Sequence, residues 1–445
     1  MSSAQQLLAR WLKFVLLFAC AVVSIPDGPA RAENNLPNSP NPAVVRELGS
    51  RFPDKPSIPP SWSIPVEPLG FSAPGANYLG MRNTMLSLDF LGENRLLFTF
   101  RVPSLMRREP GSTASDQRQI RAMVLELPSG TVLTETNWTV HDRYRYLWAV
   151  DDDHFLLRDR NIILQADSKL SPEPILQFPG TLASIQLNPG LQYIVTNSHE
   201  PPQTASKKGA AAAPASGGNG ASGDDDSEAQ NEMVLRILRR DSHQVLFVTH
   251  VHNPIELPLN VDGFLSAQHT SGTEWNVDLN YFTGQSRTLN KVKSACMPEF
   301  DFLSESQALV TACSDSGDNA LVSLTTAGTI LWTDLVTDRL VWPLITTSRN
   351  GLRFARESLY LLHSISGFSP MSSEDIKGQW VRVFDSVTGT VAFESPATPI
   401  LDAGGNVAIS PSGRRVAVLN AGSIQVFELP PPPTLPTANP SAPVH

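Results

Sequence analysis

One structural unit recurs along the chain and limits its possible folds more than any other feature. It consists of an apolar strand, a tight polar turn and a second apolar strand, and its clearest copy spans residues 406–419 (NVAISPSGRRVAVL). Short apolar or β-branched runs that end at Gly, Pro, Asn, Asp or Ser are typical of β-strands. Further copies of the unit lie at 86–100, 146–158, 182–196, 257–267, 298–311 and 344–362.

A second unit follows each copy of the first. In it, an alternating apolar strand leads through a Gly or Asp turn to a closing strand, as at 321–332 (LVSLTTAGTILW) and 381–393. Each pair of units supplies four antiparallel strands, which make one blade of a β-propeller. Seven pairs occur at a mean spacing of about 53 residues, more than the 40–45 that a compact blade needs, because several copies carry insertions.

We therefore predict an all-β fold, a β-propeller of about seven four-stranded blades, over residues 77–430. A strand near Asn77–Leu79 would close the ring by lying beside the short last unit at 424–429. The alternative is a pair of β-sandwiches, which would not produce the alternation of two turn types.

Two segments carry a resemblance to a known family. The apolar–SPSGRR–apolar unit at 409–418 and the run VFDSVTGTV at 383–391 resemble strands of WD-like and YVTN-type bacterial propellers. The resemblance covers about residues 80–430 and is specific only in the last blade. The Trp-Asp and Gly-His signatures of true WD repeats are missing, so their hydrogen-bond tetrads are not expected. Membership would imply a rigid disc with binding surfaces built from loops, and no particular chemistry.

The N-terminus reads as an export signal over residues 1–32. Arg10 and Lys13 precede the uncharged run 14–25, and Ala30-Arg31-Ala32 offers a cleavage site. The alternatives are a membrane anchor, for which 12 apolar residues are too few, and a lipoprotein processed at Cys20. We expect an exported protein, periplasmic, in the cell envelope or extracellular, without a transmembrane anchor after cleavage. Pro-rich segments follow at 33–76, read as a tether, and at 431–445, read as a disordered tail.

Three insertions interrupt the repeat, at about 103–119, 199–232 and 363–379. Each falls between the second and third strands of a predicted blade, and in a propeller those loops share one face with the connections between blades. Partners would bind on this elaborated face. The insertion at 199–232 should be disordered because of its Gly, Ala, Ser and Asp content, and deleting 203–230 should leave the domain folded.

Candidate chemical motifs give no firm site. The formal net charge of −9 argues against nucleic acid as a partner. A G-x-G-x-x-G match at 218–223 lies in a flexible run instead of between a strand and a helix. Residues 151–154 (DDDH) fit a solvated turn better than a cation site, and His250 and His252 lack an identifiable third metal ligand. We predict no catalytic, cofactor-binding or metal-binding residue; scattered Trp residues should pack between blades.

The cysteines predict a disulfide. After signal cleavage only Cys296 and Cys313 remain, in an oxidising compartment. In an antiparallel hairpin that pairs Cys296 with Cys313, the same register pairs Phe302 with Gln307 and leaves 304–305 as a two-residue loop. Facing Cα atoms would then lie within disulfide range. The alternative is two reduced, buried cysteines.

Two classes of function remain open. The first is a monomeric, non-catalytic binding or scaffolding propeller whose partner is a protein, peptide or glycan on the loop face. The second is a propeller enzyme, a lyase or hydrolase, with its site at the mouth of the central channel. Three or more converging His, Asp, Glu or Arg side chains at that mouth would favour the enzyme; an apolar or Ser/Thr-lined mouth would favour the binding protein.

Overall fold

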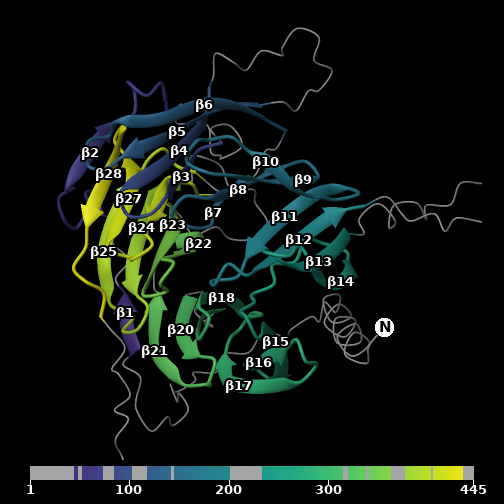
Figure 1. The fold of residues 1–445 in the computed structure, drawn as a ribbon. Helices are drawn as coiled ribbons and strands as arrows, with labels where there is room; N and C mark the ends of the chain where they lie inside the picture. The colour runs from purple at the N-terminus through teal and green to yellow at the C-terminus, as the bar shows by residue number, and fades with distance from the viewer. Residues whose placement is uncertain are drawn as a thin grey trace, which may run out of the picture.

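The structure is a computed structural model, and it describes residues 45–48, 53–73, 85–102, 118–141, 145–200, 233–313, 319–336, 340–361, 376–401 and 404–433. In these residues the fold is all-β and contains no helix. Seven sheets stand around a common axis as the blades of a propeller (Figure 1). The predicted fold class and blade number are therefore confirmed, and the blades begin within a few residues of the predicted repeat starts.

The first three blades follow one another along the chain, each with four antiparallel strands in sequence order. Blade 1 contains β3 (Ser87–Phe90), β4 (Arg95–Arg101), β5 (Arg118–Glu126) and β6 (Val132–Val140); blade 2 contains β7 (Leu147–Ala149), β8 (Phe155–Asp159), β9 (Ile162–Ala166) and β10 (Glu173–Gln177); blade 3 contains β11 (Thr181–Leu187), β12 (Tyr193–His199), β13 (Met233–Arg239) and β14 (Val245–Val251).

Blade 4 departs from the pattern because its first strand is reduced to a short stretch joined by the single bridge Leu259↔Phe264. Blades 5 to 7 each have at least four strands, and the fourth strand of blade 7 comes from the N-terminal segment described in the next paragraph. Blade 4 contains β15 (Gly263–Ser271), β16 (Glu274–Tyr281) and β17 (Ser286–Lys293); blade 5 contains β18 (Glu299–Ser304), β19 (Gln307–Cys313), β20 (Asn319–Thr325) and β21 (Ile330–Val336); blade 6 contains β22 (Leu340–Thr347), β23 (Arg353–Leu361), β24 (Ile376–Asp385) and β25 (Val391–Ala397); blade 7 contains β26 (Val407–Ile409), β27 (Arg415–Asn420) and β28 (Ser423–Glu428).

The ring is closed by a strand that the sequence reading placed in the tether. Strand β2 (Trp62–Pro65) pairs antiparallel with β28 and completes blade 7. An N-terminal strand beside the last unit was expected, but near Asn77–Leu79; those residues lie outside the described part of the chain. The shift has a physical reason: Ile64 is buried among side chains of blades 7 and 1, so this segment gains more apolar burial than its Pro-rich surroundings suggest.

The same N-terminal segment also contacts the outer strands of two other blades. Strand β1 (Val45–Leu48) adds to β21 in parallel and gives blade 5 a fifth strand. Between β1 and β2, the Ser57 amide donates to the Glu394 carbonyl of β25 at 2.8 Å. Residues 45–65 thus touch the rims of blades 5, 6 and 7 in turn.

The core lies between neighbouring blades, where large side chains from facing sheets meet. Trp332 of blade 5 stacks on Phe354 of blade 6 at a centroid distance of 6.3 Å, and Trp138 of blade 1 packs on Phe155 of blade 2 at 5.7 Å. Both indoles also donate to backbone oxygens. The predicted packing of Trp residues between blades is confirmed at these two positions, and such contacts fix the radial arrangement of the sheets.

The three predicted insertions fall where expected. They lie between β4 and β5, between β12 and β13, and between β23 and β24, the second and third strands of their blades. Most of each insertion lies outside the described residues, as does nearly all of 199–232, so the predicted disorder there stays a prediction.

Candidate functional site

The propeller has a central axis with two unlike ends. The first strands of the blades lie innermost, as β3, β7, β11, β18 and β22 do in Figure 1. At one end, which we call the turn end, run the turns between the first and second strands of each blade. The other end, which we call the insertion end, carries the connections between blades and the three insertions.

An ion pair crosses the axis at the turn end. Arg349, in the first turn of blade 6, lies 2.5 Å from the carboxylate of Asp152 in the first turn of blade 2. Blades 7 and 1 lie between these two along the ring. Arg95 of blade 1 strengthens the contact, because it pairs with Asp153 at 2.9 Å and donates to the Asp152 carbonyl at 2.8 Å.

A second tie joins the opposite half of the turn end. The Glu305 carboxylate, in the first turn of blade 5, accepts hydrogen bonds from the Asn188 amide side chain at 2.7 Å, the Gly190 N–H and the Val261 N–H at 2.6 Å. These donors belong to blades 3 and 4. Charge-assisted hydrogen bonds of this kind are stronger than neutral ones. Polar groups at the turn end are thus largely engaged with one another.

The inner strands of blades 1 and 6 carry carboxyl groups, part-way along the axis, whose charged forms are disfavoured. Burial raises the pKa of Asp89, in β3, to about 6, although the hydrogen bond from Ser87 and the charge of Arg145 offset part of that effect. The Ser87 hydroxyl donates to Asp89 at 2.6 Å. Burial likewise raises the pKa of Glu357, in β23, to about 8, against the opposing effects of a Gln379 hydrogen bond and Arg145. Arg145 stands just before β7 and therefore acts electrostatically on carboxyls from two other blades.

A second acidic group comes from blades 4 and 5. Burial raises the pKa of Asp301, in β18, to about 7, and the negative charges of Glu256 and Glu299 raise it further. Within the described part of the chain, no hydrogen bond or ion pair to the Asp301 carboxyl occurs. Glu256 precedes the first stretch of blade 4 and Glu299 begins β18, so both approach from the insertion end.

Two glycines allow the Glu357 carboxyl to sit between blades. Its Oε1 accepts a hydrogen bond from Gln379 Nε2 at 2.8 Å. The side-chain oxygen of Gln379, Oε1, in turn accepts one from Asn406 Nδ2 at 2.9 Å. A Cβ on Gly404 would lie 2.6 Å from Glu357 Oε1, and one on Gly405 would lie 2.3 Å from the Leu86 carbonyl. Both glycines have positive φ, so the connection into blade 7 needs residues without a side chain.

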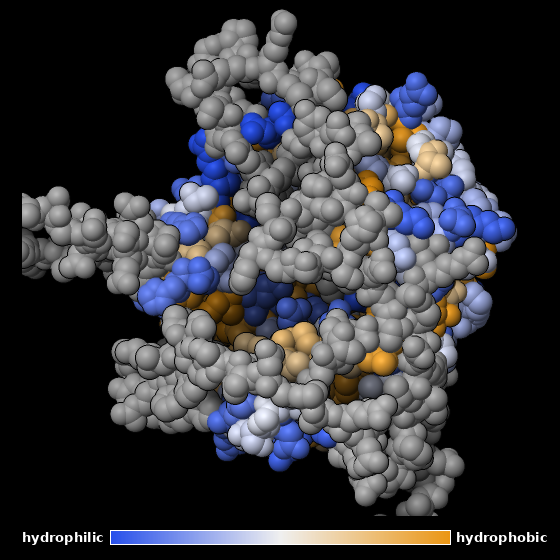
Figure 2. All heavy atoms as spheres, turned by 180° about the vertical axis from the view of Figure 1, so that it is seen from behind, coloured by the Kyte–Doolittle hydropathy of each residue, from blue (hydrophilic) through white to orange (hydrophobic). Residues whose placement is uncertain are grey.

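Seen from the side opposite to Figure 1, the molecule is hollowed near its centre (Figure 2). Hydrophilic residues lie at the floor of this hollow, with hydrophobic ones beside them. A different pocket lies at the turn end, between blades 7 and 1, where Arg415 already binds Glu93, Asn94 and Glu428. Arg414 lines the same pocket. Because Arg415 joins blade 7 to blade 1 there, the pocket is a seam between blades.

Of the motifs singled out in the sequence, one lies at the turn end and the other on the outer rim of the insertion end. Residues 151–154 form the first turn of blade 2, where Asp151 accepts from the His154 N–H at 2.7 Å. His250 lies in the outer strand β14, with His252 just beyond it. The described residues contain no group of three His, Cys, Asp or Glu suited to holding a metal ion.

Sequence reasoning missed the acidic residues of the inner strands, although a signal was present. Asp89-Phe90-Leu91 and Asp301-Phe302-Leu303 repeat the same three residues at the same place in blades 1 and 5. An Asp inside an apolar first strand, found twice at one repeat position, marks a carboxyl that faces the axis. Glu357 carried no such signal, because its burial depends on Gly404 from the next blade.

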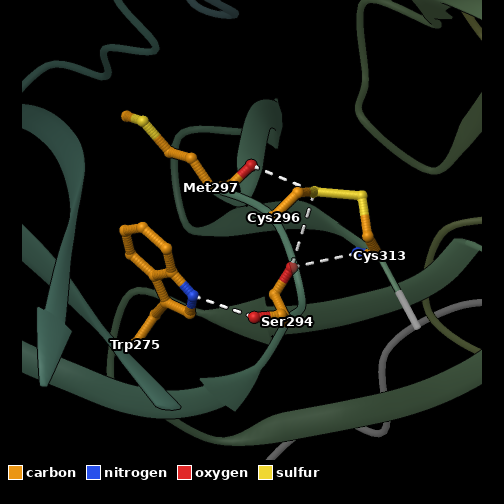
Figure 3. The surroundings of a disulfide bond; sticks show 5 residues. All are labelled: Trp275, Ser294, Cys296, Met297 and Cys313. Atoms are coloured by element: carbon orange, nitrogen blue, oxygen red, sulfur yellow. Dashed lines mark hydrogen bonds between the residues drawn. A yellow bond between two sulfur atoms is a disulfide. The ribbon is translucent and has the colours of Figure 1, made fainter. Parts of the chain in front are cut away.

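The predicted disulfide between Cys296 and Cys313 is confirmed, with a Cα–Cα distance of 5.5 Å (Figure 3). The predicted hairpin register was wrong by one residue. Phe302 pairs with Ala308, and a bulge precedes the Ser304↔Gln307 pair, so the two-residue loop is 305–306. The extra residue that a bulge inserts accounts for the shift.

Cys296 itself lies before β18, in the connection from blade 4. The Cys313 N–H donates to the Ser294 hydroxyl at 3.0 Å, and the Ser294 carbonyl accepts from the Trp275 indole at 3.0 Å (Figure 3). The disulfide therefore fastens the entry into blade 5, three residues before Glu299, to the end of the second strand of that blade.

Comparison with known proteins assigns the chain to no family. No family model matches the chain, and no curated protein matches it. Among solved structures, it is similar to the acylaminoacyl peptidase of Pyrococcus horikoshii, with 10% identity and a TM-score of 0.44 over 80% of this chain and 52% of that one. The chain thus spans about half the length of that peptidase.

Two matched structures are propellers over nearly their whole length. The β-propeller domain of the Trilobed protease from Pyrococcus furiosus is 11% identical, with a TM-score of 0.41 over 78% of this chain and 93% of that one. The C-terminal WD40 domain of Sif2 is 9% identical, with a TM-score of 0.36 over 79% and 99%. At such identities the likeness concerns the fold alone. No helix in the described residues is long and apolar enough to span a membrane.

Proposed function

We propose that the chain is an exported, non-catalytic binding or scaffolding propeller, and that its partner, a protein, peptide or glycan, engages the insertion end. The observation that carries the proposal is the contrast between the charged groups of the turn end and the carboxyls of the inner strands. Charged groups at the turn end are paired with one another across the ring, as Arg349 is with Asp152. Asp301, on the inner strand β18, has no such partner in the described residues, and the three insertions enter the chain at the insertion end.

The charges of the inner strands indicate which chemistry a partner would present. Burial disfavours the charged forms of Asp89, Asp301 and Glu357, and Arg145 acts on two of these carboxyls. A bound amine or guanidinium would favour the ionised carboxyls by direct Coulombic attraction in a site of low dielectric. A basic peptide or an amino sugar fits this description better than an acidic partner.

Affinity capture tests the proposal, with the mature protein as bait in extracts of its native cell envelope. The double variant Asp89→Asn/Asp301→Asn changes two carboxyls of the inner strands, and Asp262→Asn, an exposed turn-end residue, is the matched control. We expect the double variant to retain less than about a tenth of the captured partner, a loss of about 1.4 kcal/mol, and the control to capture as the wild type does. Equal capture by all three proteins would contradict a partner at the insertion end.

A second function, catalysis, is favoured by one specific observation. Carboxyls of blades 1, 5 and 6 with pKa values of about 6 to 8 suit general acid–base chemistry near neutral pH. Against it, the described residues show no His beside a nucleophile and no metal-binding group. A lyase or hydrolase activity that Asp89→Asn and Asp301→Asn each abolish, with binding retained, would establish the enzyme.

Export is part of the proposal and has its own test. The Cys296–Cys313 disulfide agrees with an oxidising compartment. N-terminal sequencing of the mature protein should begin at Glu33, because Ala30 and Ala32 occupy the small-residue positions. A lipid-modified Cys20 at the start would instead define a lipoprotein.

A further inference from the structure

Strand β14 of blade 3 is an outer edge without the usual protection. It ends its sheet, since the strand order is β11-β12-β13-β14. Its sequence VLFVTHV contains no Asp, Glu, Lys, Arg or Pro. Val245 is 45% exposed and Val248 49% exposed. An exposed, apolar edge strand presents unpaired backbone groups that can pair with another strand.

The other outer edges are blocked or covered. Strand β6 contains Glu135 in an ion pair with Arg121, β10 contains Pro174, and β17 contains three cations, at 287, 291 and 293. At β25 the Ser57 amide and hydroxyl occupy the backbone of Glu394. Strands β21 and β28 are covered by β1 and β2. Charges, prolines and covering strands are the ordinary means of protecting an edge, and among the described blades β14 alone lacks all three.

The terminal segments of the chain are poor candidates to cover β14. Residues 33–44 contain prolines at 37, 40 and 42, and residues 434–445 contain prolines at 436, 440 and 443. A proline cannot donate a ladder hydrogen bond. The insertion 201–232 is rich in Gly and Ala and contains three successive Asp residues, which gives it a low β-propensity. A second copy of β14, which has no proline and no Asp, Glu, Lys or Arg, fits the edge better than these three segments do.

We infer that β14 pairs antiparallel with β14 of a second copy of this chain, across a two-fold axis. The charge pattern carries the inference. In an isologous contact each residue meets the same surface again, so a charged strand such as β17 would bring like charges together, which is destabilising. A strand of seven residues without formal charge meets no such penalty. The pairing of β1 with β21 shows that outer strands of this propeller accept an added strand.

The contact area sets the expected strength. A stable protein interface buries about 1,200–2,000 Å², and a pair of seven-residue strands supplies only part of that. The dimer should therefore be weak, with dissociation in the micromolar range or above, and concentration-dependent. With Val248 at or near the axis, its exposed side chain would face its own copy and lose water contact on pairing. This inference departs from the monomer expected from the sequence and does not depend on the proposed function.

Sedimentation equilibrium over a range of about 1 to 500 µM, which brackets such a weak interface, tests the pairing. Val248→Lys places like charges against each other, and Leu133→Lys is the matched control, because Leu133 is 50% exposed on the outer strand β6. Both sites are open to solvent, so both variants should fold. We expect a concentration-dependent dimer whose dissociation constant rises at least about tenfold in Val248→Lys, corresponding to 1.4 kcal/mol, and is unchanged in Leu133→Lys.

Hydrogen exchange gives a readout that does not rely on a variant. The amides of β14 that point away from β13 should exchange more slowly at high protein concentration than at low concentration, while those of β6 should not change. A monomer over the whole range overturns the inference and leaves the edge to a strand of a different protein. A dimer unaffected by Val248→Lys, without concentration-dependent protection of β14, also overturns it, because another surface would then make the contact.

Discussion

The double variant Cys296→Ser/Cys313→Ser should unfold more easily than the wild type by about 3 kcal/mol. The bond joins residues 17 positions apart. In the chain-entropy account, a loop of that size removes about 10 cal/mol/K from the unfolded ensemble, or about 3 kcal/mol at 25 °C. Serine keeps the backbone N–H of position 313 that donates to Ser294, so the variant removes the crosslink and little else.

The assay is urea unfolding followed by tryptophan fluorescence, with calorimetry as a second measurement. For a propeller of about 350 residues the expected decrease in Tm is about 4 °C. Met297→Ala, at a side chain 57% exposed beside the bond, is the control and should change stability by less than about 0.5 kcal/mol. Thiol titration of the denatured, unreduced mature protein should find no free thiol. Two free thiols, or a double variant as stable as the control, would refute the reasoning.

Three further predictions concern the two ends of the axis. Burial raises the pKa of Asp301 to about 7, so the folded state keeps a proton that the unfolded state releases near pH 4. The stability that this group contributes is therefore present at low pH and falls as the pH rises to about 7. Asp301→Asn should reduce that fall by about 1–2 kcal/mol in urea titrations at a series of pH values, allowing for partial exposure; an unchanged pH dependence would contradict the prediction. Gly405→Ala should destabilise by more than about 2 kcal/mol, because its φ is +104° and a Cβ would meet the Leu86 carbonyl at 2.3 Å; a variant with wild-type Tm would show that the connection into blade 7 is not tight. Glu305→Ala should lower the free energy of unfolding by about 2–4 kcal/mol, since three donors from blades 3 and 4 lose their acceptor. The amides of Gly190 and Val261 should also exchange hydrogen faster; unchanged exchange there would show that Glu305 does not join these turns.

Local patterns in the sequence determined the blades. A strand of alternating apolar residues closed by a turn is written in neighbouring residues, as in 406–419, and its repetition specifies both the strands and their order around the axis. The positions of the three insertions follow from the same count. The pairing of Cys296 with Cys313 was also accessible, because the two cysteines flank one hairpin.

The tertiary structure alone decided which distant residues meet. Closure by β2, the ion pair between Arg349 and Asp152, and the burial of Glu357 against Gly404 all join segments that no local pattern relates. The one-residue error in the hairpin at 302–308 has the same origin, because a bulge depends on how β18 bends within its blade. Such contacts arise from closing seven twisted sheets into a ring, and the pKa values of Asp89, Asp301 and Glu357 follow from the water that closure excludes.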